Sequence, residues 1–258
     1  MDKAVTNWTL AITGKGGVGK TTLAALAVRW LCEQARSPVL AVDADPNTCL
    51  DALLGVEVTS TVGRVREEAK QLTQGGTAGS VSKEAWLDLK IQESMVEMDG
   101  FDLIAMGRSE GPGCYCYANN VLRGVLARLA GHYPAVVVDN EAGLENLSRR
   151  TVQEVSQMLF VSDPSLRGIM TARRLYDLSL EMAIAAESSG LVINRARDAR
   201  CLERAHELFA GTDVAILGTL PEDEELAEHA VEGSSVFGLS PDNGTYSAIS
   251  AILKTMMK

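Results

Sequence analysis

The chain has 258 residues, of which 46% are hydrophobic and 22% are charged, a composition typical of a folded globular protein and not of a disordered one. Its formal net charge of −10 argues against broad, non-specific binding to nucleic acid, because such binding depends on a basic surface. No apolar run approaches the length of a membrane span, and residues 1–7 lack a signal-peptide core, so we expect a cytoplasmic protein.

The first predicted strand, residues 8–13, leads directly into a glycine-rich loop that reads G-K-G-G-V-G-K-T, and a helical pattern follows over residues 21–35. The glycines let the backbone wrap around a polyphosphate, Lys20 is placed to reach the β- and γ-phosphates, and the Thr21 hydroxyl is placed to hold Mg²⁺. A strand, a glycine turn and a helix in this order predict a site for ATP or ADP. The predicted binding residues are Gly14, Lys15, Gly16, Gly17, Val18, Gly19, Lys20, Thr21 and Thr22.

The second lysine of this loop, Lys15, restricts the families of phosphate-loop proteins that the motif resembles. The motif resembles the deviant Walker A ATPases, which include MinD, ParA, ArsA and the nitrogenase iron protein. In that family the lysine at the position of Lys15 crosses a dimer interface to the partner's phosphates, so the resemblance implies a homodimer. The alternative for Lys15 is a solvated loop lysine.

Two aspartates follow the second predicted strand, residues 39–42. Asp43-Ala44-Asp45-Pro46 begins at the carboxyl end of this strand, where open α/β folds bind ligands. The resemblance implies that Asp45 positions or activates the attacking water, while Asp43 helps to hold the loop and the magnesium shell. The alternative for Asp45 is structural, because an Asp before Pro also starts helices and caps them with its carboxylate.

Residues 56–98 interrupt the regular order of strands and helices. Two charged stretches with helical character, residues 62–72 and 82–96, flank a glycine-rich loop. We expect this segment to be an insertion folded over the nucleotide edge of a single domain, residues 1–258. It contains no second phosphate loop, which disfavours the fused tandem arrangement of ArsA-type pumps and leaves dimerisation of two chains as the way to juxtapose two sites.

A loop with two cysteines follows the predicted strand at residues 101–106. Cys114 and Cys116 are two residues apart, so in extended chain both thiolates project from one face and reach one ion. Two ligands do not complete a tetrahedral site, but a two-fold axis near this loop supplies four thiolates from two chains. Ni²⁺, Zn²⁺, Cu(I) and an iron–sulfur cluster all accept thiolates, so ligand type alone does not select the metal. A reduced exposed pair or a redox dithiol is the alternative.

The hydrophobic strand predicted at residues 135–138 ends in Asp139, which is the Walker B pattern. We predict that Asp139 supports Mg²⁺ through water. The next residues read N-E-A-G-L-E-N and resemble the family's switch II, where Gly143 gives the loop freedom to respond to the γ-phosphate. No role follows from the sequence for Glu141.

Asn194 and Arg195 follow the predicted strand at residues 191–193. They match the position where the deviant Walker A family recognises adenine, and an Asn amide can both donate to and accept from the adenine edge. We expect Pro221 to close the other side of the base. An Asn at a strand end is also common without any ligand.

Taken together, the apolar runs alternate with helical patterns, which predicts an α/β fold with a mostly parallel, twisted sheet and helices on both faces. The remaining expected strands lie at residues 158–161 and 214–217, and the remaining expected helices at residues 119–130, 169–181 and 201–209.

The phosphate loop, the D-A-D-P turn, the C-x-C loop and the D-N-E-A-G-L-E-N switch, in this order, look like the CooC-type maturation ATPases. That family assists nickel insertion into carbon monoxide dehydrogenase, and close relatives serve acetyl-CoA synthase. The C-x-C loop is the specific mark, since MinD and ParA proteins lack it. The resemblance implies an ATPase with Mg²⁺, and with Ni²⁺ or Zn²⁺ at Cys114 and Cys116. It also implies a homodimer with a nickel enzyme as client, and neither nucleic acid nor membrane as partner.

Two other functions stay open. A MinD- or ParA-like positioning ATPase acts on a membrane or on DNA, but a membrane-binding tail is expected to be basic, and residues 247–258 carry only two lysines. An electron-transfer ATPase carries an iron–sulfur cluster on shared cysteines, as the nitrogenase iron protein does.

Overall fold

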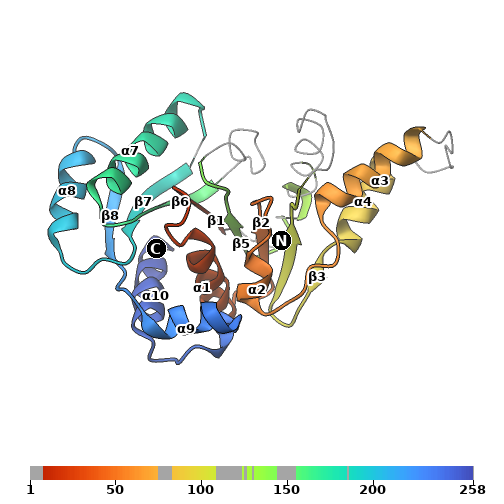
Figure 1. The fold of residues 1–258 in the computed structure, drawn as a ribbon. Coiled ribbons are helices and arrows are strands. Elements are labelled where there is room, and N and C mark those ends of the chain that lie inside the picture. Colours follow the sequence, from red (N-terminus) through yellow and green to blue (C-terminus); the bar gives the residue numbers. More distant parts are fainter. Residues whose placement is uncertain are drawn as a thin grey trace, which may run out of the picture.

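An eight-stranded sheet forms the centre of the protein (Figure 1). The structure is a computed structural model that describes residues 8–74, 83–108, 124, 127–129, 131–143, 155–184 and 186–257. The strand order is β3-β4-β2-β5-β1-β6-β7-β8, and every neighbouring pair is parallel except β3 and β4. The strands are β1 (Trp8–Gly14), β2 (Val39–Asp43), β3 (Val96–Glu97), β4 (Phe101–Ala105), β5 (Ala135–Asp139), β6 (Val155–Ser162), β7 (Ala186–Ile193) and β8 (Val214–Thr219). The predicted α/β fold with a mostly parallel sheet is confirmed.

Helices cover both faces of this sheet. They are α1 (Lys20–Glu33), α2 (Leu50–Leu54), α3 (Val62–Gln74), α4 (Lys83–Glu93), α7 (Leu166–Glu181), α8 (Arg200–Leu208), α9 (Glu224–Glu232) and α10 (Gly244–Met256), with a short 3₁₀ helix, η1 (Val236–Gly238). Within the described residues, none of them combines the length and the apolar character that crossing a lipid bilayer requires.

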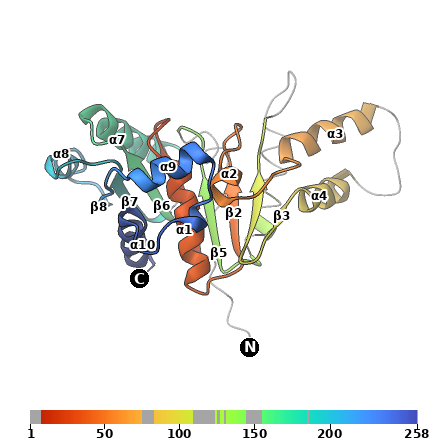
Figure 2. The same ribbon diagram turned by 60° about the horizontal axis from the view of Figure 1, so that its bottom comes forward.

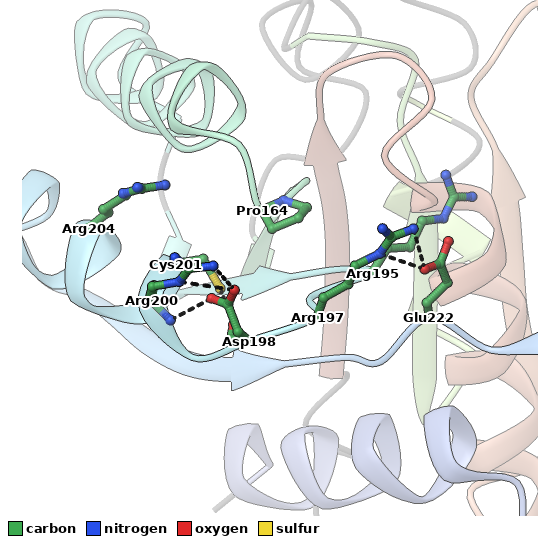
Figure 3. A pocket seen from close by; sticks show the side chains of 8 residues that line it. All are labelled: Pro164, Arg195, Arg197, Asp198, Arg200, Cys201, Arg204 and Glu222. Carbon is green, nitrogen blue, oxygen red and sulfur yellow. Dashed lines mark hydrogen bonds and ion pairs between the residues drawn. The ribbon is translucent and has the colours of Figure 1, made fainter.

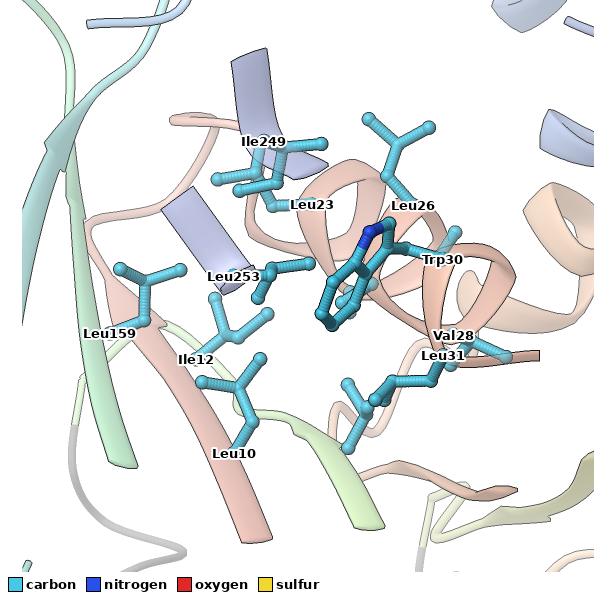
Figure 4. Close-up of a cluster of buried hydrophobic side chains, with 14 of the residues drawn as sticks. Leu10, Ile12, Leu23, Leu26, Val28, Trp30, Leu31, Leu159, Ile249 and Leu253 are labelled. Atoms are coloured by element: carbon cyan, nitrogen blue, oxygen red, sulfur yellow. The ribbon is translucent and has the colours of Figure 1, made fainter. Parts of the chain in front are cut away.

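The core is divided between the two faces because successive residues of a strand point in opposite directions. On β1, Leu10 and Ile12 join a large cluster with α1 and α10, which Figure 4 shows. Ala11 points the other way and joins a second cluster with α7 and α8. Strands that are buried on both faces read as continuous apolar runs, and this is why their positions could be recognised in the sequence.

The inserted segment packs on one face of the sheet. Side chains of α3 and α4 such as Val65 and Ile91 are buried with Leu40 and Val42. The backbone N–H of Gly63 at the start of α3 donates to the carbonyl oxygen of Met106 just after β4. Figure 2 shows α3 and α4 side by side, at the end of the sheet opposite to α7 and α8. Apolar side chains of both helices, Val65 on α3 and Leu87 and Ile91 on α4, are stabilised there by burial against the sheet.

Arg29 joins α1 to the chain segment that precedes α10. This arginine is only 5% exposed. Its Nη1 donates to the carbonyl oxygens of Val236 (2.8 Å) and Leu239 (3.1 Å), and its Nε donates to Glu33 (2.9 Å). The guanidinium also lies over the ring of Tyr246, 4.1 Å from its centroid. A buried cation that satisfies two buried carbonyls holds the helix which starts at the phosphate loop.

Replacing Arg29 by Met should lower the free energy of unfolding by about 2–4 kcal/mol, because two buried carbonyl oxygens lose their donor. Urea denaturation measures the change. The matched control is Arg64→Met, which removes an exposed ion pair with Glu68 and should cost about 0.5 kcal/mol or less. Equal losses in the two variants would contradict the role assigned to Arg29.

Candidate functional site

The candidate site lies where β1, β2 and β5 end. In the parallel register Asp139 of β5 is the partner of both Asp43 on β2 and Ile12 on β1. The phosphate loop that follows β1 therefore lies beside the two carboxylates that end its neighbouring strands. This is the edge at which open α/β sheets bind ligands.

Three glycines give the phosphate loop its shape. Gly17 and Gly19 have φ values of 80° and 95°, in the left-handed region that favours glycine. A Cβ atom on Gly14 would lie 2.3 Å from the carbonyl oxygen of Val161 on β6. Gly19 precedes α1 without a side-chain cap, so the first-turn N–H groups of this helix can receive an anionic ligand.

Asn194 supports this loop from the other side. Its Nδ2 donates to the carbonyl oxygen of Val18 at 2.8 Å, and its Oδ1 accepts from the backbone N–H of Arg195 at 3.0 Å. A Cβ atom on Gly19 would lie 2.4 Å from the same Nδ2. We predicted Asn194 from its possible contact with adenine, and the sequence held no signal for this second contact with the loop.

A cavity of about 270 Å³ lies beside the loop and brings together residues that were predicted separately. Asn194, Arg195 and Pro221 line it with Thr22. Apolar atoms from α1 and α9 contribute as well, through Leu23, Leu226, Ala227 and Ala230. Its position next to the phosphate loop and its partly apolar lining suit a flat heterocyclic base.

Lys20 lies among three acidic side chains. It is 7% exposed, and its Nζ donates to the carbonyl oxygen of Lys15 at 3.3 Å. Burial lowers the pKa of Lys20, while the charges of Asp139, Asp45 and Glu141 oppose this change. The side chain of Lys15 is exposed, and Glu141, for which the sequence suggested no role, contributes to the field around Lys20.

Asp139 is a buried carboxylate that the described residues leave without a hydrogen-bond partner at either oxygen. It is 1% exposed, and burial raises its pKa to about 7, against the effects of the nearby Thr21 hydroxyl and of Lys20. Unused carboxylate oxygens beside a hydroxyl are hard oxygen donors, the kind that Mg²⁺ prefers. The donor set therefore fits a magnesium ion.

Asp43 has a different environment from Asp139. Its Oδ1 accepts from the N–H of Asp45 (3.0 Å), and its Oδ2 accepts from the N–H groups of Cys49 (2.9 Å) and Leu50 (3.0 Å). Burial raises the pKa of Asp43 to about 6, although these hydrogen bonds oppose the rise. Asp43 thus holds the loop and caps α2, the capping role that we had considered for Asp45.

Asp45 and Asn47 connect this loop to the end of β4. Asp45 Oδ1 accepts from the backbone N–H (2.8 Å) and the side-chain Nδ2 (3.0 Å) of Asn47. The Oδ1 of Asn47 accepts in turn from Nη2 of Arg108, which is 61 positions away in the sequence. No local pattern indicated this contact.

Two predicted features extend beyond the described part of the chain. Cys114 and Cys116 lie outside the described residues, and within those residues no group of three or more His, Cys, Asp and Glu side chains could hold a metal ion.

At the start of the predicted switch II, Gly143 has a φ of 113°, and its carbonyl oxygen accepts from the Thr13 hydroxyl at 2.8 Å. This contact ties the switch to the strand that carries the phosphate loop.

Comparison with known proteins identifies the family. The family model described as "CobQ/CobB/MinD/ParA nucleotide binding domain" matches residues 9–236, so the chain belongs to this family. The prediction of a P-loop ATPase is confirmed at the level of the protein family. An uncharacterized ATP-binding protein of Methanocaldococcus jannaschii is 39% identical, over 96% of this chain and 98% of its own length.

Two further proteins bear on the choice of function. The carbon monoxide dehydrogenase accessory protein CooC of Rhodospirillum rubrum is 27% identical, over 90% of each chain. The solved structure of the septum site-determining protein MinD from Pyrococcus horikoshii, complexed with Mg-ADP, superposes with a TM-score of 0.70 at 21% identity. The superposition covers 97% of this chain and 96% of the MinD chain, and it shows that the two proteins share a fold.

Gly19→Ala should weaken ATP binding by about tenfold or more, because the added methyl group displaces Asn194 and strains a left-handed turn. Calorimetric titration with Mg-ATP measures the affinity. Gly244→Ala is the control, since no atom lies within 4 Å of the added Cβ and its φ is ordinary. Unchanged ATP affinity in Gly19→Ala would show that the loop does not need this geometry.

Proposed function

We propose that the protein is an ATP-dependent maturation factor that dimerises on nucleotide and metal binding and assists nickel insertion into a client enzyme. The clients that fit are carbon monoxide dehydrogenase and acetyl-CoA synthase. The observation that carries this proposal is the C-x-C motif of Cys114 and Cys116, within a chain that is similar to CooC over 90% of its length. In this proposal nickel is the cargo, and ATP binding drives the change from monomer to dimer.

In this proposal the nucleotide is held from both ends. Lys20 and the first-turn amides of α1 bind the phosphates, while Asn194, Arg195 and Pro221 enclose the base. Thr21 and Asp139 would hold Mg²⁺, directly or through water, and the ion would offset charge on the phosphates. Asp43 contributes by fixing the loop that carries Asp45.

Hydrolysis in this proposal requires two further side chains. Asp45 orients the attacking water, and its hydrogen bonds to Asn47 hold the carboxylate in place. Lys15 has an exposed side chain at the leading edge of the loop, which suits a cation delivered across a two-fold axis to the nucleotide of the partner. Each site is then complete only in a dimer.

The contact between Asn47 and Arg108 suggests how the nucleotide and the metal communicate. Arg108 precedes Cys114 by six positions in the sequence, and Asn47 is bound to the predicted catalytic Asp45. A movement of the Asp45 loop on hydrolysis would therefore act on the start of the segment that carries both cysteines. Hydrolysis would change the metal site through this contact.

A MinD-like positioning ATPase is the second candidate, supported by the likeness in fold to MinD. Membrane binding of that type uses an amphipathic helix whose apolar face is free. The apolar face of α10 is instead buried in the core, through Tyr246, Ile249 and Leu253. This helix is thus not available for a membrane, which favours the maturation role.

Replacing Cys114 and Cys116 together by Ser should abolish binding of Ni²⁺ or Zn²⁺ and client activation, while ATP binding stays within a few fold. The wild type should bind about one ion per dimer, since each chain supplies half of a tetrahedral set. Metal analysis measures the number of bound ions, and light scattering on the same anaerobic sample measures the fraction of dimer. Cys49→Ser, at an exposed cysteine, is the matched control.

Three results would contradict the shared nickel site. One tightly bound ion per monomer would exclude sharing across the dimer axis. Normal client activation by the double Ser variant would reject the role of the cysteines and favour a positioning ATPase. A brown protein after anaerobic purification would indicate an iron–sulfur cluster and the electron-transfer alternative.

Mixing Lys15→Ala with Asp45→Ala protomers should restore part of the ATPase activity that each variant lacks. In a hybrid dimer one of the two sites receives an intact Asp45 and an intact trans lysine, and a cation in trans can contribute about three orders of magnitude in rate. Phosphate release measures the activity, and native mass spectrometry verifies the hybrids. No recovery in a mixture that contains hybrids would count against a trans role.

A further inference from the structure

A second cavity, of about 500 Å³, opens beside the base cavity and is lined mainly by charged side chains (Figure 3). It lies where the chain passes from β7 into α8, and a residue that follows β8 closes one side. We call it the arginine bowl, and its charged members are Arg195, Arg197, Asp198, Arg200, Arg204 and Glu222.

The charges of the bowl are only partly balanced. Arg197 pairs with Glu222 at 3.0 Å, and Arg200 pairs with Asp198. Neither Arg195 nor Arg204 forms an ion pair with any residue of the described ranges. Four guanidinium groups and two carboxylates leave a net charge of +2 on the lining, in a chain whose net charge is −10. The bowl is therefore suited to an anionic group.

The positions of the two unpaired arginines favour an extended ligand over a compact one. Arg204 lies at one end of the bowl, and Arg195 lies at the other end with Arg197 and Glu222 (Figure 3). Guanidinium groups bind carboxylates in a two-pronged geometry. A chain that carries carboxylates at intervals can reach both ends and leave the internal ion pairs undisturbed.

Exposed apolar side chains on the helix that follows Pro164 favour a protein as this ligand. Pro164 lines the bowl, and α7 begins two residues later. Leu166 and Met170 on the first turns of α7 are 49% and 37% exposed. Nucleic acid would gain little from these side chains, and it would be repelled by the net negative charge of the chain.

We propose that the arginine bowl is a docking site for an acidic segment of a partner protein. Glutamate or aspartate side chains of the segment bind Arg204 and Arg195, and its apolar side chains cover Leu166 and Met170. This inference does not depend on the metal role of the cysteines.

Docking at the bowl is linked to the nucleotide. Nη1 of Arg195 donates to the carbonyl oxygen of Gly17 in the phosphate loop at 3.5 Å, and Arg195 has a left-handed φ of 55°. Arg195 and Glu222 also line the base cavity. Because both ligands contact the same side chains, ATP changes the affinity for the acidic segment, and the segment changes the affinity for ATP by the same factor.

The test uses a short fluorescein-labelled peptide of glutamate and leucine, with a second peptide in which glutamine replaces glutamate. Fluorescence anisotropy should show binding of the acidic peptide to the wild type, and the affinity should differ with and without ATP. Arg204→Glu should weaken binding by about tenfold, since an exposed attraction becomes a repulsion. ATP binding by this variant in the absence of peptide should be unchanged.

Arg36→Glu is the matched control, because Arg36 is also exposed but lies between α1 and β2, at the amino end of the sheet. If both substitutions weaken peptide binding equally, the effect comes from the overall charge of the protein, and the proposed docking site is wrong. Absence of binding up to about 1 mM peptide would also overturn it. Duplex DNA that binds more tightly than the peptide and is lost in Arg204→Glu would reassign the bowl to nucleic acid. Displacement of the peptide by an equal concentration of inorganic phosphate would reassign it to small anions.

Discussion

The parallel register of β1, β2 and β5 is the constraint on which the nucleotide site depends. These strands are buried on both faces, so charged side chains are placed where the strands end. Because Asp139 is in register with Asp43 and with Ile12, the phosphate loop and both carboxylates arrive at one edge. A shift of one strand by one residue would exchange its faces and turn its carboxylate to the opposite side of the sheet.

The two buried aspartates show how the same residue type serves structure and function. Asp43 is surrounded by three backbone N–H groups, so its charge is used within the protein. Asp139 has no such donor among the described residues; the groups that stabilise its charge are the Thr21 hydroxyl and the cation of Lys20, and a buried carboxylate needs such neighbours. The different surroundings show that Asp43 supports the loop, whereas the oxygens of Asp139 accept from no backbone N–H group of the described residues.

Arg195 lies between the phosphate loop and the two cavities. It adopts a left-handed turn directly after the buried Asn194, it contacts the phosphate loop, and it lines both the base cavity and the arginine bowl. An ATPase that acts on a client has to report its nucleotide state at a surface. In the proposed docking, a side chain shared between two cavities would do this without a large rearrangement, because either ligand would act on the same side chain and the same backbone turn.

The sequence by itself determined seven of the eight strands of the sheet, the main helices and the phosphate loop, because the apolar runs and the glycine spacing act over a few neighbouring residues; it did not indicate the short edge strand β3 or the helices α2 and α9. It also marked Asp43, Asp139 and Asn194 as polar residues at strand ends, although not what each one contacts. Only the tertiary structure decided that Asn194 holds Val18, 176 positions away, and that Arg108 reaches Asn47. The arginine bowl likewise needs Glu222 beside Arg197. Such contacts join segments that are distant in the sequence, so they follow from the packing of strands and helices and leave no local pattern.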